Sequence, residues 1–237
     1  MDVVRRGWVE SDRIEFGEQH RASMQAGAQE ITYLLNRKYD IKSVVAFVGN
    51  HYQLTERQRM ALTRMITSCP KAEERKKKKQ MFKTGIDAVY VDGFNTIITL
   101  EVALSGSLLL KSVDGTLRDL AGLRGTYRIV DKTIRAVTLM LNGLQAIKPK
   151  EIIVYLDQPV SNSGRLKGLI YETAEEMQLN VQVEVIPDVD RRLYGLEWVI
   201  TSDAIILDHC QSWYNLNTQL VETHISDAWI YELNAWE

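Results

Sequence analysis

The sequence predicts an α/β fold, a mostly parallel central sheet with helices on both faces, preceded by a small all-helical module. Apolar strand-like runs alternate with helical stretches from residue 85 onward, whereas the first 70 residues show only helical periodicity. This alternation indicates βαβ units. With 237 residues, 45% of them hydrophobic, the chain can bury a substantial core. We predict a helical basic module (1–70), a basic linker or helix extension (71–84) and an α/β domain (85–237).

Three helices are expected in the first module, over residues 19–38, 41–49 and 55–68. Thr55 and Gln58 have the spacing of a capping box at the start of the third helix. The following segment contains Arg75 and four consecutive lysines, which repel one another and must stay near solvent. The segment is therefore either a flexible linker or an exposed extension of a helix.

The second part is expected to alternate between strands and helices. Residues 114–119 begin with Asp114-Gly115 and predict a turn followed by a helix start. The predicted strands are 88–92, 107–110, 152–156, 181–186 and 198–201, and the predicted helices are 95–104, 127–144 and 163–177. A final apolar stretch covers residues 229–233.

Charge is distributed unevenly along the chain. Residues 1–83 contain 17 Lys and Arg against 10 Asp and Glu, whereas residues 150–237 contain 5 against 15. The difference suggests an anionic partner on the first part and a cation-filled acidic pocket on the second, although charge also varies between domains without a specific partner. No apolar run approaches the roughly 20 residues of a membrane span, and the start lacks a signal-peptide core. We expect a cytoplasmic protein with no membrane contact.

Three predicted strands end on an aspartate: Asp92, Asp157 and Asp203. The carboxyl ends of parallel strands lie along one edge of a sheet, so these side chains are expected to converge there. Converged carboxylates favour a hard cation such as Mg²⁺ or Mn²⁺, which completes its coordination with water and substrate phosphates. Each aspartate alone could equally be an ordinary strand-end or helix-cap residue.

The same residues carry a resemblance to a known superfamily. Val91-Asp92-Gly93-Phe94-Asn95 resembles the opening motif of PIN-like and NYN-type nucleases, Thr201-Ser202-Asp203 resembles their late Thr-Ser-Asp motif, and Asp157 is similar to the middle acid of the NYN branch. The whole chain also resembles a mainly archaeal family catalogued as a domain of unknown function.

This resemblance implies a nuclease domain that binds one or two divalent ions and cuts RNA with a metal-activated water. It makes Asp92, Asp157, Asp203 and Asp208 the implied metal ligands and catalytic residues, and Asn95 a residue that orients a ligand or the substrate. PIN-like domains often pair, so the resemblance also permits a homodimer.

Two further groups of residues are candidates for binding the substrate. A loop that precedes a predicted helix contains Ser161, Asn162, Ser163 and Arg165, which could bind a phosphate at the helix N-terminus or could form an ordinary capped turn. The basic residues of the first part could bind nucleic-acid phosphates or could be solvated surface; they are Arg57, Arg59, Arg64, Lys76, Lys77 and Lys78.

The function that these residues predict is divalent-metal-dependent hydrolysis of RNA phosphodiester bonds, with DNA as the alternative substrate. The main alternative is a noncatalytic RNA-binding or regulatory protein that has lost an essential ligand. A phosphatase or nucleotidyl-transfer enzyme is disfavoured, because Asp92 is followed by Gly93 and Phe94 rather than by the second acid of an Asp-x-Asp pair.

Overall fold

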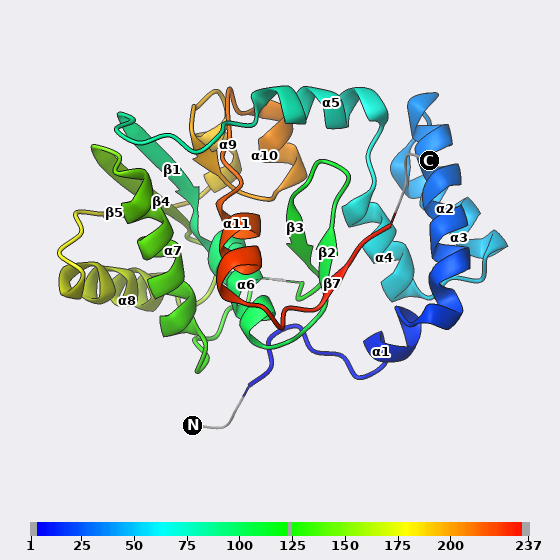
Figure 1. The fold of residues 1–237 in the computed structure, drawn as a ribbon, viewed down its shortest axis with the longest axis horizontal. Coiled ribbons are helices and arrows are strands. Elements are labelled where there is room, and N and C mark those ends of the chain that lie inside the picture. Colours follow the sequence, from blue (N-terminus) through cyan, green and yellow to red (C-terminus); the bar gives the residue numbers. More distant parts are fainter. Residues whose placement is uncertain (1–3, 123–124, 234–237) are drawn as a thin grey trace.

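The computed structural model describes residues 4–122 and 125–233. It contains a parallel sheet of four strands, and Figure 1 shows how the helices are arranged around it. The strand order is β5-β4-β1-β6, and every neighbouring pair in it is parallel. The strands are β1 (Ala88–Asp92), β4 (Glu151–Asp157), β5 (Gln182–Ile186) and β6 (Val199–Ile200).

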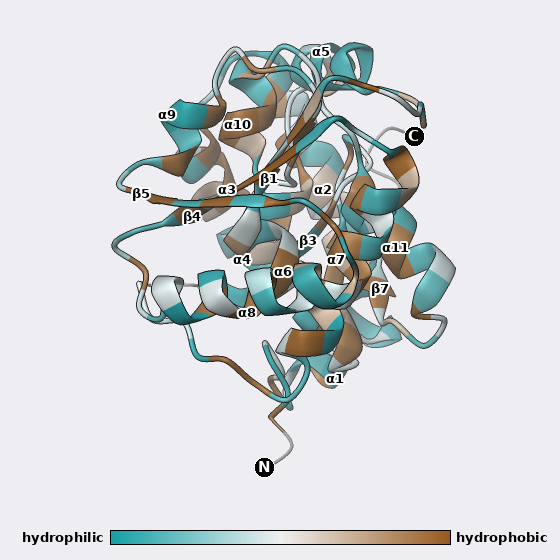
Figure 2. Cartoon of the chain, turned by 90° about the vertical axis from the view of Figure 1, so that its left-hand side faces the viewer, coloured by the Kyte–Doolittle hydropathy of each residue, from teal (hydrophilic) through white to brown (hydrophobic). Residues whose placement is uncertain are grey.

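Helices cover both faces of this sheet. Side chains alternate between the faces along each strand: Val89 and Val91 belong to one core, and Tyr90 packs against the other. Figure 2 shows β4 and β5 between α8 on one side and α9 with α10 on the other. The first face carries α6 (Gly93–Leu104), α7 (Thr133–Ile147), α8 (Ser163–Glu176) and α11 (Leu216–His224), and the second carries α9 (Val189–Leu193) and α10 (Ala204–His209). The predicted fold class is confirmed.

The described residues before β1 form five helices, which we call the helical module; the predicted boundary at residue 70 falls inside the last of them. Its helices are α1 (Asp12–Glu15), α2 (Glu18–Asn36), α3 (Ile41–His51), α4 (Glu56–Met65) and α5 (Cys69–Lys78). The predicted capping box is present: the Thr55 hydroxyl accepts from the Gln58 amide, and the Gln58 side chain accepts from the Thr55 amide. Most of the lysine-rich segment is helical in α5, with its basic residues in the last turn, where the helix dipole favours cations.

A second, smaller sheet lies between the module and the parallel sheet (Figure 1). Its order is β3-β2-β7, formed by β2 (Leu109–Lys111), β3 (Leu117–Asp119) and β7 (Ile230–Tyr231). The prediction of a helix start within 114–119 is therefore wrong. The turn is present, but Leu117 is fully buried and the segment pairs antiparallel with β2. A sequence-local signal for a turn cannot distinguish a following helix from the return strand of a hairpin.

The small sheet completes the core of the helical module. Leu108, Leu110 and Leu120 pack in one buried cluster with side chains of α2, α3 and α4, and so do Tyr231 and Leu233 from the C-terminal part. The module therefore buries its apolar surface against the rest of the chain. Within the described ranges, no helix combines the length and apolar character needed to cross a bilayer.

Candidate acidic site at the edge of the parallel sheet

The site begins where β1 passes directly into α6. The buried Asp92 side chain is the N-cap of α6, accepting from the Asn95 amide at 3.4 Å. Its other carboxyl oxygen accepts from the Thr201 hydroxyl at 2.8 Å. Gly93 has no room for a side chain, because an added Cβ would lie 2.6 Å from Leu156 Cδ2 and 2.9 Å from the Tyr155 carbonyl oxygen. Close packing on β4 thus explains why glycine follows Asp92.

The Thr-Ser-Asp segment joins Asn95 into the same network. The Asn95 side-chain oxygen accepts from the amide and the hydroxyl of Ser202, at 2.8 and 2.9 Å. The Asp203 amide donates to the Thr201 hydroxyl at 3.0 Å, and the Asp203 carboxylate caps α10. Two short motifs that are far apart in the sequence therefore form one hydrogen-bonded unit.

The hydrogen-bonded unit lies at the carboxyl ends of two neighbouring strands, β1 and β6. The chain leaves β1 to build β4 and β5 on one side and returns to place β6 on the other side of β1. The helix after β1 and the helix after β6 cover opposite faces. The carboxyl ends of β1 and β6 therefore form the topological switch point, where open α/β sheets bind their ligands.

Four acids share the electrostatics of this edge. Burial raises the pKa of Asp92 to about 8, against the Thr201 hydrogen bond, and the charges of Asp203, Asp157 and Asp190 raise it further. Burial and then Asp203 and Asp157 raise the pKa of Asp190 to about 6. The pKa of Asp157 is also raised, first by partial burial and then by Asp188. Carboxyl groups that raise one another's pKa are a usual property of functional sites.

Asp190 is a residue that the sequence analysis missed. It lies on α9, directly after β5, the fourth strand of the same parallel sheet. The sequence contains the signal: a strand is predicted over residues 181–186, and the acids that follow it in Pro187-Asp188-Val189-Asp190 belong to the same edge, because the carboxyl ends of parallel strands share it.

The four acids of this edge have no ion-pair partner in the described part of the chain, although the charge of Asp203 acts on Arg118. Among the residues that the structure describes, no lysine or arginine forms an ion pair with Asp92, Asp157, Asp190 or Asp203. Backbone amides partly take that role, because Asp92, Asp157 and Asp203 each accept from at least one. As the described side chains stand, no three His, Cys, Asp or Glu residues form an arrangement that could hold a metal ion by themselves.

The structure does not bring Asp208 into this group. One Asp208 carboxyl oxygen lies 2.6 Å from Arg75 Nε and the other 3.1 Å from Lys71 Nζ. Although partial burial acts in the opposite direction, Arg75 and Lys71 hold the pKa of Asp208 below its usual value. Asp208 lies in the last turn of α10, whereas Asp203 precedes the first.

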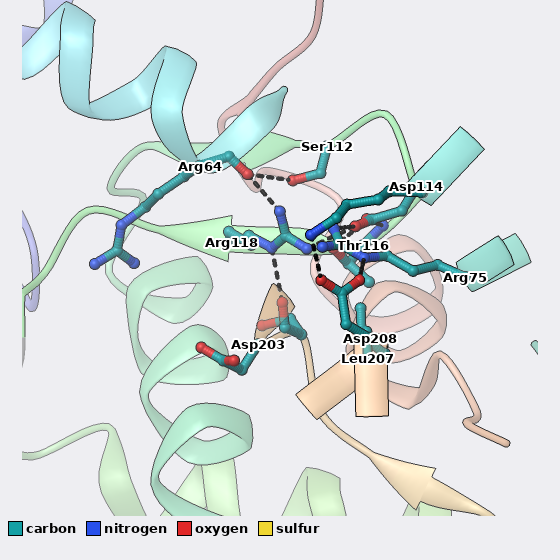
Figure 3. Close-up of polar contacts among 12 residues, drawn as sticks. Arg64, Arg75, Ser112, Asp114, Thr116, Arg118, Asp203, Leu207 and Asp208 are labelled. Atoms are coloured by element: carbon teal, nitrogen blue, oxygen red, sulfur yellow. Dashed lines mark hydrogen bonds and ion pairs between the residues drawn. The ribbon is translucent and has the colours of Figure 1, made fainter. Parts of the chain in front are cut away.

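Asp208 instead joins a buried charged cluster (Figure 3). We call Arg75, Asp114, Arg118 and Asp208 the paired cluster, because their charges balance. Asp114 accepts from Arg75 at 2.9 Å and from Arg118 at 2.6 Å. Although burial opposes it, Arg118 and Arg75 lower the pKa of Asp114. Arg118 also donates to the Ser202 carbonyl oxygen at 2.7 Å and to that of Arg64. The paired cluster therefore connects α4 and α5 to the acidic edge.

The loop predicted to bind phosphate makes contacts within the protein. The Ser161 hydroxyl accepts from the Tyr127 amide at 2.9 Å, and the Asn162 side chain donates to the Tyr127 carbonyl oxygen at 2.7 Å. Asn162 is the N-cap of α8 with φ +63°, Ser163 is the first helical residue, and Arg165 is exposed. Ser161 and Asn162 thus fix the chain before α7, which begins at Thr133, later than predicted.

The basic residues predicted to bind nucleic acid separate into two groups. The arginines make internal contacts: Arg57 pairs with Asp12, and Arg64 donates to the Asp119 carbonyl oxygen at 2.7 Å. Arg59 donates to the Leu54 carbonyl oxygen at 2.8 Å. Among the lysines, Lys78 donates to the Leu207 and Asp208 carbonyl oxygens at the end of α10, whereas Lys76 and Lys77 are exposed.

Comparison with known protein families shows which family the chain belongs to. Residues 83–219, more than half of the chain, match the model of a domain of unknown function, DUF5616. The chain belongs to this family. Residues 23–78 match the model of a second protein family of unknown function, DUF434. In the DUF5616 part lie all four acids of the sheet edge, and in the DUF434 part lie α3, α4, α5 and most of α2.

A relative is also found in an archaeon. The uncharacterized protein MJ0935 of Methanocaldococcus jannaschii is 31% identical over 186 residues, which cover 78% of this chain and 89% of that protein. No solved structure matches the chain. These findings confirm the predicted similarity to an archaeal family of unknown function, and the resemblance to PIN-like and NYN-type nucleases stays a prediction.

Proposed function

We propose that this protein is a divalent-metal-dependent nuclease of the PIN/NYN-like type that hydrolyses RNA phosphodiester bonds at the acidic edge of the parallel sheet. The observation that supports the proposal most is the set of four acids at the carboxyl edge of the sheet. Burial raises the pKa of Asp92, Asp190 and Asp157, neighbouring acids raise it further, and within the described residues no cation is paired with any of the four. Such a group gains stability from a bound cation.

The donor chemistry of the edge fits Mg²⁺ or Mn²⁺. Every candidate ligand is a carboxylate oxygen, and both ions prefer oxygen. Mg²⁺ usually takes only one or two protein carboxylates and fills its remaining positions with water and substrate phosphates, so a site without three preformed protein ligands is compatible with it. We assign Asp92 and Asp203 as the main ligands, with Asp157 and Asp190 as the further acids; Asp208 is left out because Arg75 and Lys71 occupy it.

The chain's own residues have separable roles in this proposal. A bound divalent ion would supply an acidified water and charge stabilisation on the phosphate. Thr201 orients the Asp92 carboxylate, and Asn95 fixes the Ser202 backbone next to Asp203. With its raised pKa of about 8, Asp92 is largely protonated near neutral pH, so binding of a cation must release its proton.

The proposal is tested by metal binding and cleavage measured on the same samples. We would titrate Mn²⁺ into wild type, Asp92→Asn and Asp203→Asn by calorimetry in two buffers of different ionisation enthalpy, and assay each on single-stranded and structured RNA. The proposal expects saturable binding with proton release in wild type, loss of at least tenfold in affinity in both variants, and Mn²⁺-dependent cleavage that they lose.

Asp87→Asn is the matched control, because Asp87 precedes the opposite end of β1 and, of the residues that the structure describes, forms an ion pair only with the exposed Lys150. This variant should bind Mn²⁺ and cleave like wild type. Equal cleavage by wild type and Asp92→Asn would exclude this edge as the active site.

A noncatalytic RNA-binding protein is the second candidate. It is favoured by the hydrogen bonds that let Asp92 and Asp203 act as helix N-caps, a role that requires no metal. Absence of Mn²⁺ binding together with retained RNA affinity would support this candidate.

A further inference from the structure

The helical module and α10 enclose a cavity beside the acidic edge. Its volume is about 590 Å³, within the roughly 300–1,000 Å³ range of ordinary ligand sites. Lys38 and Tyr39 line it from the segment between α2 and α3, Lys71 from α5, and Ala204 and Ile205 from α10. Ala204 and Ile205 directly follow Asp203, so the cavity opens next to the proposed catalytic edge.

The charge of the cavity favours an anion. Four cationic side chains line it, Lys38, Lys71, Arg75 and Arg118, together with one acid, Asp208. Asp114 and Asp208 balance Arg75 and Arg118, so the excess positive charge comes from Lys38 and Lys71. Asp208 is already paired with Arg75 and Lys71. Lys38 is exposed, and 58% of the Lys71 side chain remains accessible, so both ammonium groups can reach a ligand that enters from solvent.

Two neighbouring cavities extend this surface over α2 and α3. The first, of about 300 Å³, shares Tyr39 with the large cavity and includes Phe47; the second, of about 480 Å³, adds Tyr33 and adjoins the first at Leu34. We call the three together the aromatic furrow. Tyr33, Tyr39 and Phe47 are 56, 59 and 71% exposed.

Exposed aromatic rings beside lysines match the chemistry of one ligand class. Single-stranded nucleic acids present unpaired bases that stack on aromatic side chains and phosphates that bind lysine and arginine. A duplex keeps its bases stacked inside and would leave the rings unused. Arg37, whose guanidinium lies 3.5 Å from the Tyr33 ring centroid, adds a further cation to the furrow. Two acids lie near the furrow: Asp40 is the N-cap of α3, and Glu30, which lines the second cavity, accepts from the Tyr52 hydroxyl at 2.7 Å.

We propose that the aromatic furrow binds a single-stranded RNA segment, with bases on Tyr39 and Phe47 and phosphates on Lys38 and Lys71, and leads that strand to the acidic edge. The last part of this inference rests on the proposed nuclease function. The binding itself does not, because the furrow lies mainly on the helical module and none of the four edge acids lines it.

The test measures binding without cleavage. Fluorescence anisotropy with a 5′-labelled, mixed-sequence 12-mer RNA in excess EDTA would compare wild type with Tyr39→Ala/Phe47→Ala, Tyr39→Phe and Lys38→Gln/Lys71→Gln. We expect about tenfold or greater weakening for the double alanine variant and near-wild-type affinity for Tyr39→Phe, because stacking needs the ring and not the hydroxyl. The lysine variant should reduce the slope of log affinity against log salt by about 1.4, since each lost single-strand phosphate contact contributes about 0.7.

Matched controls lie elsewhere on the surface. Phe82 is 54% exposed between α5 and β1, and Lys167 lies on α8; Phe82→Ala and Lys167→Gln should leave binding unchanged. A duplex of the same sequence should bind more weakly and should not respond to Tyr39→Ala/Phe47→Ala.

Three results would overturn the inference: no RNA binding by wild type, equal weakening by the furrow and control variants, or a self-association that Tyr39→Ala/Phe47→Ala abolishes while RNA affinity stays constant. The last would make the furrow a contact for a second copy. If wild type binds RNA through the furrow but shows no Mn²⁺-dependent cleavage, the nuclease function is contradicted and the furrow assignment remains.

Discussion

Two groups of charged residues lie next to each other in this protein, and the charges are balanced in one group and unbalanced in the other. In the paired cluster, Asp114 contacts Arg75 and Arg118, and its pKa is lowered despite burial. At the acidic edge, Asp92 is equally buried, but its neighbours are other acids and its pKa is raised to about 8. Ser202 joins the two groups, because its carbonyl oxygen accepts from Arg118 and its amide donates to Asn95. Balanced buried charges are typical of a structural role, whereas acids with raised pKa values and no paired cation are more frequent at functional sites.

The largest loss of folding stability is expected when a member of the paired cluster is removed. Asp114→Ala leaves the buried Arg75 and Arg118 guanidinium groups without their shared carboxylate, and an uncompensated buried charge costs about 3–5 kcal/mol. Urea unfolding at pH 7 should show this loss of stability. Asp87→Asn, which removes an exposed pair with Lys150, should give no measurable change. A similarly small effect for Asp114→Ala would mean that the paired cluster does not stabilise the fold.

The second prediction is a gain in folding stability when Asp92 loses its charge. Burial raises the pKa of Asp92 from its unfolded value near 3.8 to about 8, so the folded state holds a proton that the unfolded state releases, and stability falls as pH rises between these values. In EDTA at pH 8, Asp92→Asn should therefore be more stable than wild type, by about 1–3 kcal/mol. The difference should vanish near pH 4.

Thermal unfolding across pH 4–9 measures this effect. Saturating Mn²⁺ should reverse the order at pH 8, because the ion stabilises the wild-type carboxylate and cannot bind the amide in the same way. A variant that is less stable than wild type at every pH in EDTA would show that the cap and the Thr201 hydrogen bond outweigh the charge penalty.

A smaller gain in folding stability is expected when Asp190 is replaced by asparagine. Its pKa is raised to about 6, chiefly by burial and then by Asp203 and Asp157, so the stability that wild type loses is confined to roughly pH 4–6. The side chain lies at the surface of α9, where solvent weakens the penalty. Asp190→Asn should raise the midpoint of thermal unfolding slightly at pH 7 and not at pH 4. A gain as large as that of Asp92→Asn would place Asp190 in a drier environment than the structure does.

The part of the site that the sequence predicted is the part that depends on strand ends. Asp92, Asp157 and Asp203 were found because the carboxyl ends of parallel strands share an edge, a rule that requires only the order of elements. Asp190 follows from the same rule applied to β5 but was not drawn from it. The capping box at Thr55 and Gln58 was predictable for a similar reason, because its hydrogen bonds are local.

The rest depends on contacts between distant segments. Ser161 and Asn162 bind the Tyr127 backbone, and Arg57 pairs with Asp12; nothing near these residues in the sequence indicates those partners. The strand over residues 117–119 likewise exists because β2 offers it a pairing edge. The aromatic furrow was missed because periodicity assigns apolar helix residues to a core, whereas Tyr33 and Phe47 lie outside it.

The shared core of the helical module has a consequence for synthesis. Tyr231 and Leu233 pack with side chains of α2, α3 and α4, yet the ribosome makes them only after the whole parallel sheet. The helices that emerge first therefore keep part of their apolar surface exposed until these residues are synthesised, and the α/β portion can fold before the core of the helical module is complete. In an arrested chain that ends before β7, chaperones and proteases should accordingly bind the N-terminal helices rather than the most recently synthesised residues.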